Sequence, residues 1–384
     1  MSFDIAPEWV HVQYKEVAKF TEVYGFSGSQ GMVNCEGVRF LPKGKPSKTL
    51  AVFMHPATTL QLLPVPRALA QAGVHVLCAA SRFAKNDTPL IMEKVALDLG
   101  AYLRHAKENW GYEKILLCGW SGGGSLAMLY QSQAEKPSVK KTPSGDEINL
   151  EGLIKADAMI FQAAHLSRAT YLAESIDPSV LDEADPDRRD PELDIYDPKC
   201  PHQPPYSPQF ISLFRKKQLA RVRRRTAWVK EMLARLKGDE MERGFITHRT
   251  MADLRYVDPA IDPNDRKPGW CYMGKPATAN NGPIGLGRFS TLRAWLSQWS
   301  IDDTNADGPR CAKSISVPLL AIENSADDAV PQPHARIIHD AAASRDKTFR
   351  VIKGATHYYQ GQPDLLKQAV ELCVGWMDKQ HLLD

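Results

Sequence analysis

Residues 119–124 place one serine among four glycines, in the order Gly-Trp-Ser-Gly-Gly-Gly. An apolar run, 114–119, precedes the serine, and a segment of helix-forming residues, 122–134, follows it. A Walker loop would need a lysine after its last glycine and a dinucleotide loop would need G-x-G-x-x-G, and neither pattern fits. The residues do fit G-x-S-x-G, in which a tight strand-to-helix turn exposes a nucleophilic serine. Ser121 is therefore the candidate nucleophile, and a turn without chemistry is the alternative.

A serine nucleophile needs a base that removes its proton and an acid that orients the base. When the nucleophile lies on such a turn, the acid and then the histidine follow later strands of the chain. Asp327 and Asp328 come after the apolar run 317–323, and His357 comes after the run 348–354. The sequence therefore predicts a serine, a carboxylate and a histidine that act together.

These motifs, in this order, resemble those of the α/β-hydrolase superfamily. Its members often have A-D-x-x-V-P after the seventh strand and G-x-x-H after the eighth, and this chain has Ala-Asp-Asp-Ala-Val-Pro and Gly-Ala-Thr-His there. In that register the resemblance makes Asp327 the acid and His357 the base. Asp328 and Glu323 are the alternatives for the acid.

The resemblance also implies an oxyanion hole. One donor would be the backbone N–H of the residue after the nucleophile, here Gly122. The other would come from the loop after the third strand, His-Pro-Ala-Thr-Thr at 55–59, where members usually have His-Gly before the donor. Pro56 has no N–H, so Ala57 is the expected donor and Thr58 is the alternative.

Aromatic and polar residues near these motifs are expected to form a substrate pocket. The expected pocket residues are His55, Thr58, Trp120, Trp270, Tyr272, Trp295 and Tyr358. Core packing explains each of the aromatic side chains in the segment 165–312 equally well when taken singly. A pocket of this composition suits a small-molecule substrate with an apolar or aromatic part.

The elements that must position these residues follow from hydrophobic periodicity. Strands are expected at 49–54, 74–80, 114–119, 156–164, 317–323 and 348–354, and helices at 63–72, 89–108, 122–134, 331–344 and 363–379. The alternation predicts an α/β fold with a mostly parallel central sheet flanked by helices. The resemblance implies that this is the α/β-hydrolase fold. We expect residues 1–164 and 313–384 to form the core and residues 165–312 to form an inserted, mainly helical cap domain. The resemblance covers the core from about residue 50 and does not identify a subfamily for the cap.

A basic stretch at 215–237 is the strongest local charge in the cap. Within it apolar residues recur at helical spacing, which predicts an amphipathic helix with a charged outer face rather than a nucleic-acid site. The residues of this stripe are Leu219, Val222, Thr226, Val229, Leu233 and Leu236. An anionic substrate group, such as a coenzyme A phosphate, is the alternative partner of the basic face.

Other whole-chain properties limit the function. The formal net charge of +3 is small for 384 residues, so no nucleic-acid partner is expected. The sequence shows no signal-peptide pattern and no apolar stretch long enough to span a bilayer, which predicts a cytoplasmic protein without a membrane partner. No group of side chains has metal-ligand spacing, so neither a metal nor a cofactor is expected. His334 and His339 are expected to face solvent, and a homodimer is left open.

Together these patterns predict a serine hydrolase that cleaves a carboxylic ester, lactone or thioester through a Ser-His-Asp triad and an acyl-enzyme intermediate. An acyltransferase or a carbon–carbon bond hydrolase would use the same triad. A non-catalytic ligand receptor on the same fold is the alternative of a different class.

Overall fold

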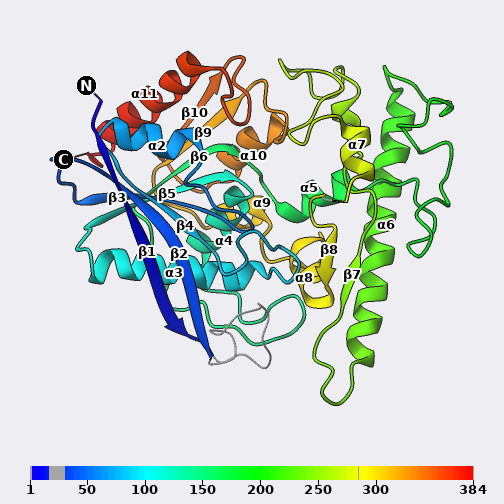
Figure 1. Cartoon of the computed structure of the whole chain (residues 1–384), viewed down its shortest axis with the longest axis horizontal. Coiled ribbons are helices and arrows are strands. Elements are labelled where there is room, and N and C mark those ends of the chain that lie inside the picture. Colours follow the sequence, from blue (N-terminus) through cyan, green and yellow to red (C-terminus); the bar gives the residue numbers. More distant parts are fainter. Residues whose placement is uncertain (1, 17–30, 284, 384) are drawn as a thin grey trace.

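An eight-stranded sheet forms the centre of the protein (Figure 1). The computed structural model describes residues 2–16, 31–283 and 285–383. Its central strands, in spatial order, are β1 (Ile5–Lys15), β2 (Met32–Pro42), β4 (His75–Ala80), β3 (Thr49–His55), β5 (Lys114–Ser121), β6 (Ala158–Ala164), β9 (Leu319–Asn324) and β10 (Lys347–Ile352). The last six strands of this order, from β4 through β3, β5, β6 and β9 to β10, are parallel. Strands β1 and β2 are antiparallel to each other, and β2 is antiparallel to β4. The predicted mostly parallel sheet is confirmed, and the β1–β2 hairpin is an addition that the sequence patterns did not predict.

Helices cover both faces of this sheet. On one face lie α3 (Met92–Glu108), α4 (Gly123–Glu135), α9 (Gly308–Ala312) and α10 (Pro333–Ala341), and on the other lie α2 (Pro64–Gln71) and α11 (Pro363–Lys379). Successive strand residues point to opposite faces, so Val52 packs into the first layer and Phe53 into the second. Burial on both faces explains why the central strands are continuous apolar runs.

The chain between β6 and β9 forms a second group of elements beside the sheet. It contains α5 (Arg168–Ser175), α6 (Pro208–Arg235), β7 (Gly244–Ile246), the 3-10 helix η1 (Leu254–Tyr256), α7 (Pro276–Asn281), β8 (Phe289–Thr291), α8 (Leu292–Gln298) and α9. In Figure 1 the long helix α6 stands on the far side of this group from the sheet. The last of these helices, α9, packs into the core layer with α4 rather than with the rest of the group.

Helix α6 is amphipathic, as its spacing predicts. Val222 and Val229 are buried against Trp295 and Trp299 of the neighbouring segment, in a hydrophobic cluster separate from the two beside the sheet. On the outer face Arg223 pairs with an aspartate, and other basic side chains of the helix are exposed to solvent. Of the helices in the described part of the chain, none is long and apolar enough to cross a membrane.

Candidate active site

Ser121 lies at the end of β5. Its φ is +51°, a left-handed backbone conformation that residues other than glycine rarely adopt. The glycines after it allow neighbouring strands to approach closely. A Cβ on Gly123 would lie 2.4 Å from the carbonyl oxygen of Met54, and one on Gly124 would lie 2.6 Å from that of His165. The turn therefore needs these glycines for packing, while the strained serine projects from the carboxyl edge of the sheet.

The acid and base candidates meet in the loops after β9 and β10. His357 Nδ1 lies 2.9 Å from Asp327 Oδ2, and both side chains are almost fully buried. The other carboxylate oxygen, Oδ1, accepts hydrogen bonds from the backbone N–H groups of Ala329 and Val330, at 2.8 and 2.7 Å. These two bonds fix the carboxylate, so that Nδ1–H of the histidine donates to it and Nε2 is left as a proton acceptor.

The alternatives for the acid have different surroundings. Asp328 is next to the pair in sequence, but its buried Oδ1 has no hydrogen-bond partner among the described residues. Burial and the neighbouring Asp327 raise the pKa of Asp328. Glu323 lies within β9, where burial raises its pKa. In this structure the carboxylate hydrogen-bonded to His357 is Asp327.

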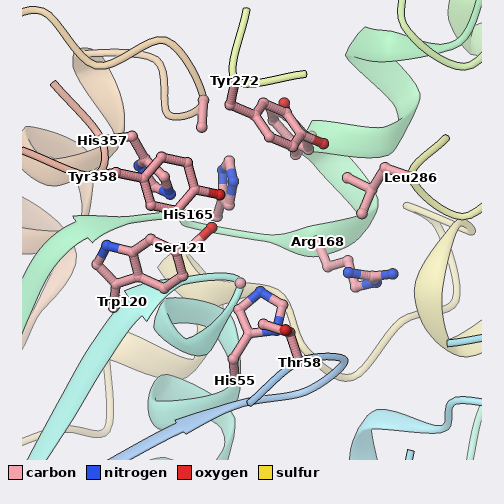
Figure 2. A pocket seen from close by; sticks show the side chains of 13 residues that line it. His55, Thr58, Trp120, Ser121, His165, Arg168, Tyr272, Leu286, His357 and Tyr358 are labelled. Atoms are coloured by element: carbon pink, nitrogen blue, oxygen red, sulfur yellow. The ribbon is translucent and has the colours of Figure 1, made fainter. Parts of the chain in front are cut away.

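Ser121, His357 and Trp120 line one pocket of about 220 Å³ (Figure 2). The ring of Trp120 packs on the imidazole of His357 with the centroids 4.4 Å apart. Within the described residues no hydrogen bond joins the Ser121 hydroxyl to His357. Such bonds are often long without substrate and shorten in the reacting complex.

The loop after β3 forms the floor of this pocket. The backbone N–H of Ala57 donates to His55 Nδ1 at 3.0 Å, and Ala57 does not line the pocket. This contact departs from the expectation that Ala57 gives the second oxyanion bond, because its N–H is already engaged. Thr58, the alternative, and Gly122 both line the pocket.

Five of the seven expected pocket residues do line the pocket: His55, Thr58, Trp120, Tyr272 and Tyr358. Contrary to expectation, Trp270 and Trp295 do not. Trp295 is fully buried inside the second group of elements, where it stacks on Trp299 and donates a 2.9 Å hydrogen bond to Thr226 Oγ1. Trp270 is exposed at the surface beneath the ammonium group of Lys267.

The remaining pocket wall was not among the expected pocket residues. It consists of His165, Arg168, Tyr171, Leu286 and Ala329. The first three lie just after β6, at the carboxyl edge where α/β sheets bind ligands. Their position after this strand is the sequence feature that could have identified them as pocket residues. The guanidinium of Arg168 is only 4% exposed and donates to Asp87 at 2.6 Å and to Gln298 at 2.8 Å.

Three histidines around the pocket are held neutral. Burial, with smaller contributions from Arg168 and His357, lowers the pKa of His55 to about 3. Burial, with smaller contributions from three neighbouring histidines and Arg168, places the pKa of His165 well below its ordinary value. Burial also lowers the pKa of His334 to about 3, although this residue was expected to face solvent. It is only 3% exposed because α10 packs on β6, where the ring accepts from the Leu166 N–H.

The strand order, the serine turn and the two loops after β9 and β10 define the α/β-hydrolase fold. Among solved structures, the chain is similar to the α/β hydrolase GrgF from Penicillium sp. sh18, with a TM-score of 0.52 and 12% identity over 94% of this chain and 98% of that one. It is also similar to Est1E from Butyrivibrio proteoclasticus, with a TM-score of 0.47 and 15% identity over 91% and 95% of the two chains. A third is a monoacylglycerol lipase from Paleococcus ferrophilus, with a TM-score of 0.46 and 14% identity over 88% and 96%. No protein-family model and no curated protein matches the sequence.

Proposed function

We propose that this protein is a serine hydrolase of carboxylic esters, lactones or thioesters. The observation that supports it best is the fixed Asp327–His357 pair, whose histidine lines one pocket with Ser121. The carboxylate holds Nδ1–H, so that Nε2 is the basic atom of the histidine. The left-handed turn presents the serine hydroxyl at the same edge of the sheet.

The reaction follows from these roles. Ser121 Oγ attacks the substrate carbonyl carbon while His357 Nε2 takes the hydroxyl proton. The tetrahedral adduct collapses, the bond to the leaving group breaks, and the leaving group receives that proton. Water then attacks the acyl-enzyme with the same histidine as base, and the acid is released with Ser121 restored. Gly122 N–H is the proposed first donor to the oxyanion.

The pocket indicates the substrate class. Trp120, Tyr272 and Tyr358 offer aromatic surface for an apolar or aromatic part of a small molecule. Arg168 adds a nearly buried guanidinium whose charge is compensated by Asp87, so it suits a neutral hydrogen-bond acceptor better than a second anion. We therefore propose a substrate that combines an aromatic or apolar part with a carbonyl or ether oxygen away from the scissile bond. The chain between β6 and β9 supplies Arg168, Tyr272 and three other residues of the pocket lining, which is the proposed role of the cap.

A serine-directed fluorophosphonate tests the proposal. We expect one equivalent to add to the wild-type protein, peptide mass mapping to place it on Ser121, and Ser121→Ala to remain unlabelled with an unchanged circular dichroism spectrum. A folded wild-type protein that stays unlabelled would contradict the function. Product analysis of an aryl ester with and without added alcohol or thiol then separates hydrolysis from acyl transfer.

A further inference from the structure

We propose that the side chain of His55, through Nε2–H, is the second donor of the oxyanion hole. The inference rests on the proposed serine chemistry and deepens it. It assigns to a side chain the bond that the fold usually takes from a backbone N–H in this loop. Three observations support it: the tautomer of the ring, the place of Nε2, and the state of the other donors in the loop.

The tautomer follows from one hydrogen bond. A backbone N–H can only donate, so the 3.0 Å contact from Ala57 makes His55 Nδ1 an acceptor. A neutral imidazole whose Nδ1 accepts has its hydrogen on Nε2. The ring is buried and faces the positive charge of Arg168, which disfavours protonation, so the neutral form persists at ordinary pH.

The place of Nε2 is next to the serine turn. A Cβ added to Gly122 would lie 2.7 Å from His55 Nε2, so the ring edge rests directly against this glycine. No acceptor for Nε2–H exists among the described residues, and His55 lines the pocket together with Ser121 and Gly122. Figure 2 shows the imidazole on the pocket floor beside Thr58, below Ser121. An oxyanion bound at Gly122 N–H would therefore lie within reach of Nε2–H.

The other groups of the loop are less suited to this role. Pro56 has no N–H, and the Ala57 N–H is bonded to the ring of His55. The loop is also held in place, because the Pro56 carbonyl accepts from Ser81 Oγ at 2.6 Å and the Ala57 carbonyl accepts from the Lys85 N–H at 2.9 Å. A turn fixed in this way keeps Nδ1 occupied and Nε2–H directed outward. Thr58 N–H is the competing donor.

Two substitutions separate an oxyanion donor from a residue that only positions the loop. An asparagine side chain places its amide near the position of Nδ1, so His55→Asn keeps an acceptor for the Ala57 N–H and loses the donor at Nε2. A glutamine side chain reaches the position of Nε2, so His55→Gln keeps a donor there and loses the acceptor. The two roles therefore predict opposite orders of activity.

We expect His55→Asn to lower kcat for an aryl ester by about 10²–10³-fold with KM little changed, as the loss of one oxyanion donor does. Binding of a trifluoromethyl ketone, which forms an oxyanion adduct with the serine, should weaken by a similar factor, while binding of the acid product should not. His55→Gln should recover at least tenfold of the loss in kcat. Near-wild-type kcat in the asparagine variant, or a glutamine variant that is the slower of the two, would overturn the proposal.

A measurement on the unmodified protein avoids any folding defect of the variants. In ¹⁵N-labelled wild-type protein, we expect Nε2 of His55 to have the chemical shift of a protonated nitrogen, and its hydrogen to move downfield when the trifluoromethyl ketone adduct forms. An unprotonated Nε2, or a hydrogen that does not move, would also overturn the proposal. Fluorophosphonate labelling distinguishes failure of the proposed serine chemistry from failure of the proposed role of His55. If the wild-type protein is labelled at Ser121 and the His55→Asn variant is unimpaired, only the role of His55 is refuted.

Discussion

Replacing Asp327 with asparagine tests the proposed triad with little change in shape. The backbone N–H groups of Ala329 and Val330 both need an acceptor, and in the native protein Oδ1 accepts from both. In Asp327→Asn the amide oxygen must take this position, because the amide nitrogen cannot accept. The nitrogen then faces His357 and donates to Nδ1, which moves the ring hydrogen to Nε2. His357 would then present Nε2–H, a donor, to Ser121 and could not remove the proton of the serine hydroxyl.

The size of the effect can be worked from the structure. At 2.9 Å between Nδ1 and Oδ2, the attraction between a carboxylate and the imidazolium formed during reaction is about 6 kcal/mol at an effective dielectric constant of about 20. Since about 1.4 kcal/mol corresponds to a tenfold change in rate, removing the charge should lower kcat by about 10⁴-fold. The same substitution in known Ser-His-Asp triads has an effect of about this size.

The assay is kcat for a chromogenic aryl ester, measured beside the thermal unfolding midpoint. Asp328→Asn and Glu323→Gln are the matched controls, because both remove a nearby carboxylate that is not hydrogen-bonded to His357. We expect both controls to stay near wild-type activity and Asp327→Asn to remain folded. An asparagine variant that keeps more than about a tenth of the activity, or a stronger loss in a control, would refute the reasoning.

Three further predictions concern the pocket, the elbow and acid stability. Arg168→Met should raise KM for esters with a second carbonyl or ether oxygen by about tenfold, the size of one hydrogen bond to a charged group, and leave simple aryl esters little affected; equal effects on both would contradict the acceptor role. Gly123→Ala should abolish soluble folded protein or activity, since its Cβ would lie 2.4 Å from the Met54 carbonyl, and a fully active variant would refute this packing. In the folded protein the pKa values of His165 and His334 are lowered, whereas in the unfolded chain both histidines have the ordinary value of about 6.5. Below pH 6.5 the unfolded chain therefore binds more protons than the folded protein. The free energy of unfolding should fall as the pH falls below 6.5, by up to about 1.4 kcal/mol per pH unit for each histidine. Urea unfolding from pH 7 to 5 checks this, and an equal slope in His334→Gln would count against it.

The sequence predicts the parallel part of the fold well because those strands are buried on both faces. The strand Lys114–Ser121 is buried from its second residue to its end, and its residues from Ile115 to Cys118 form the kind of apolar run that sequence patterns detect. The hairpin of β1 and β2 escaped detection because much of β1 is exposed. It contains Pro7, and the apolar Trp9 is 68% exposed, so it lies on the solvent face and obscures the alternation of Val10 and Val12.

Side-chain placement in the pocket could be predicted only where a motif fixed it. Trp270 and Tyr272 are separated by one residue, and no local pattern says which of them faces the pocket. The backbone N–H of Tyr272 donates to the Asp328 carbonyl at 3.1 Å, a long-range contact that draws it toward the acid loop. The missing N–H of Pro56 is visible in the sequence, but the bond between Ala57 and His55 depends on a side-chain rotamer.

The order of the strands in space has a consequence for how the chain is made. Strand β6 has β5 on one side and β9 on the other, and β9 begins only at Leu319, after all the elements of the second group. As the chain leaves the ribosome, the apolar β6 therefore has one unpaired edge until the whole second group of elements has been synthesised. Ser121 emerges before this group and His357 after it. A nascent chain thus contains its nucleophile long before its base. Until β9 is made, the exposed edge of β6 can also aggregate or bind chaperones.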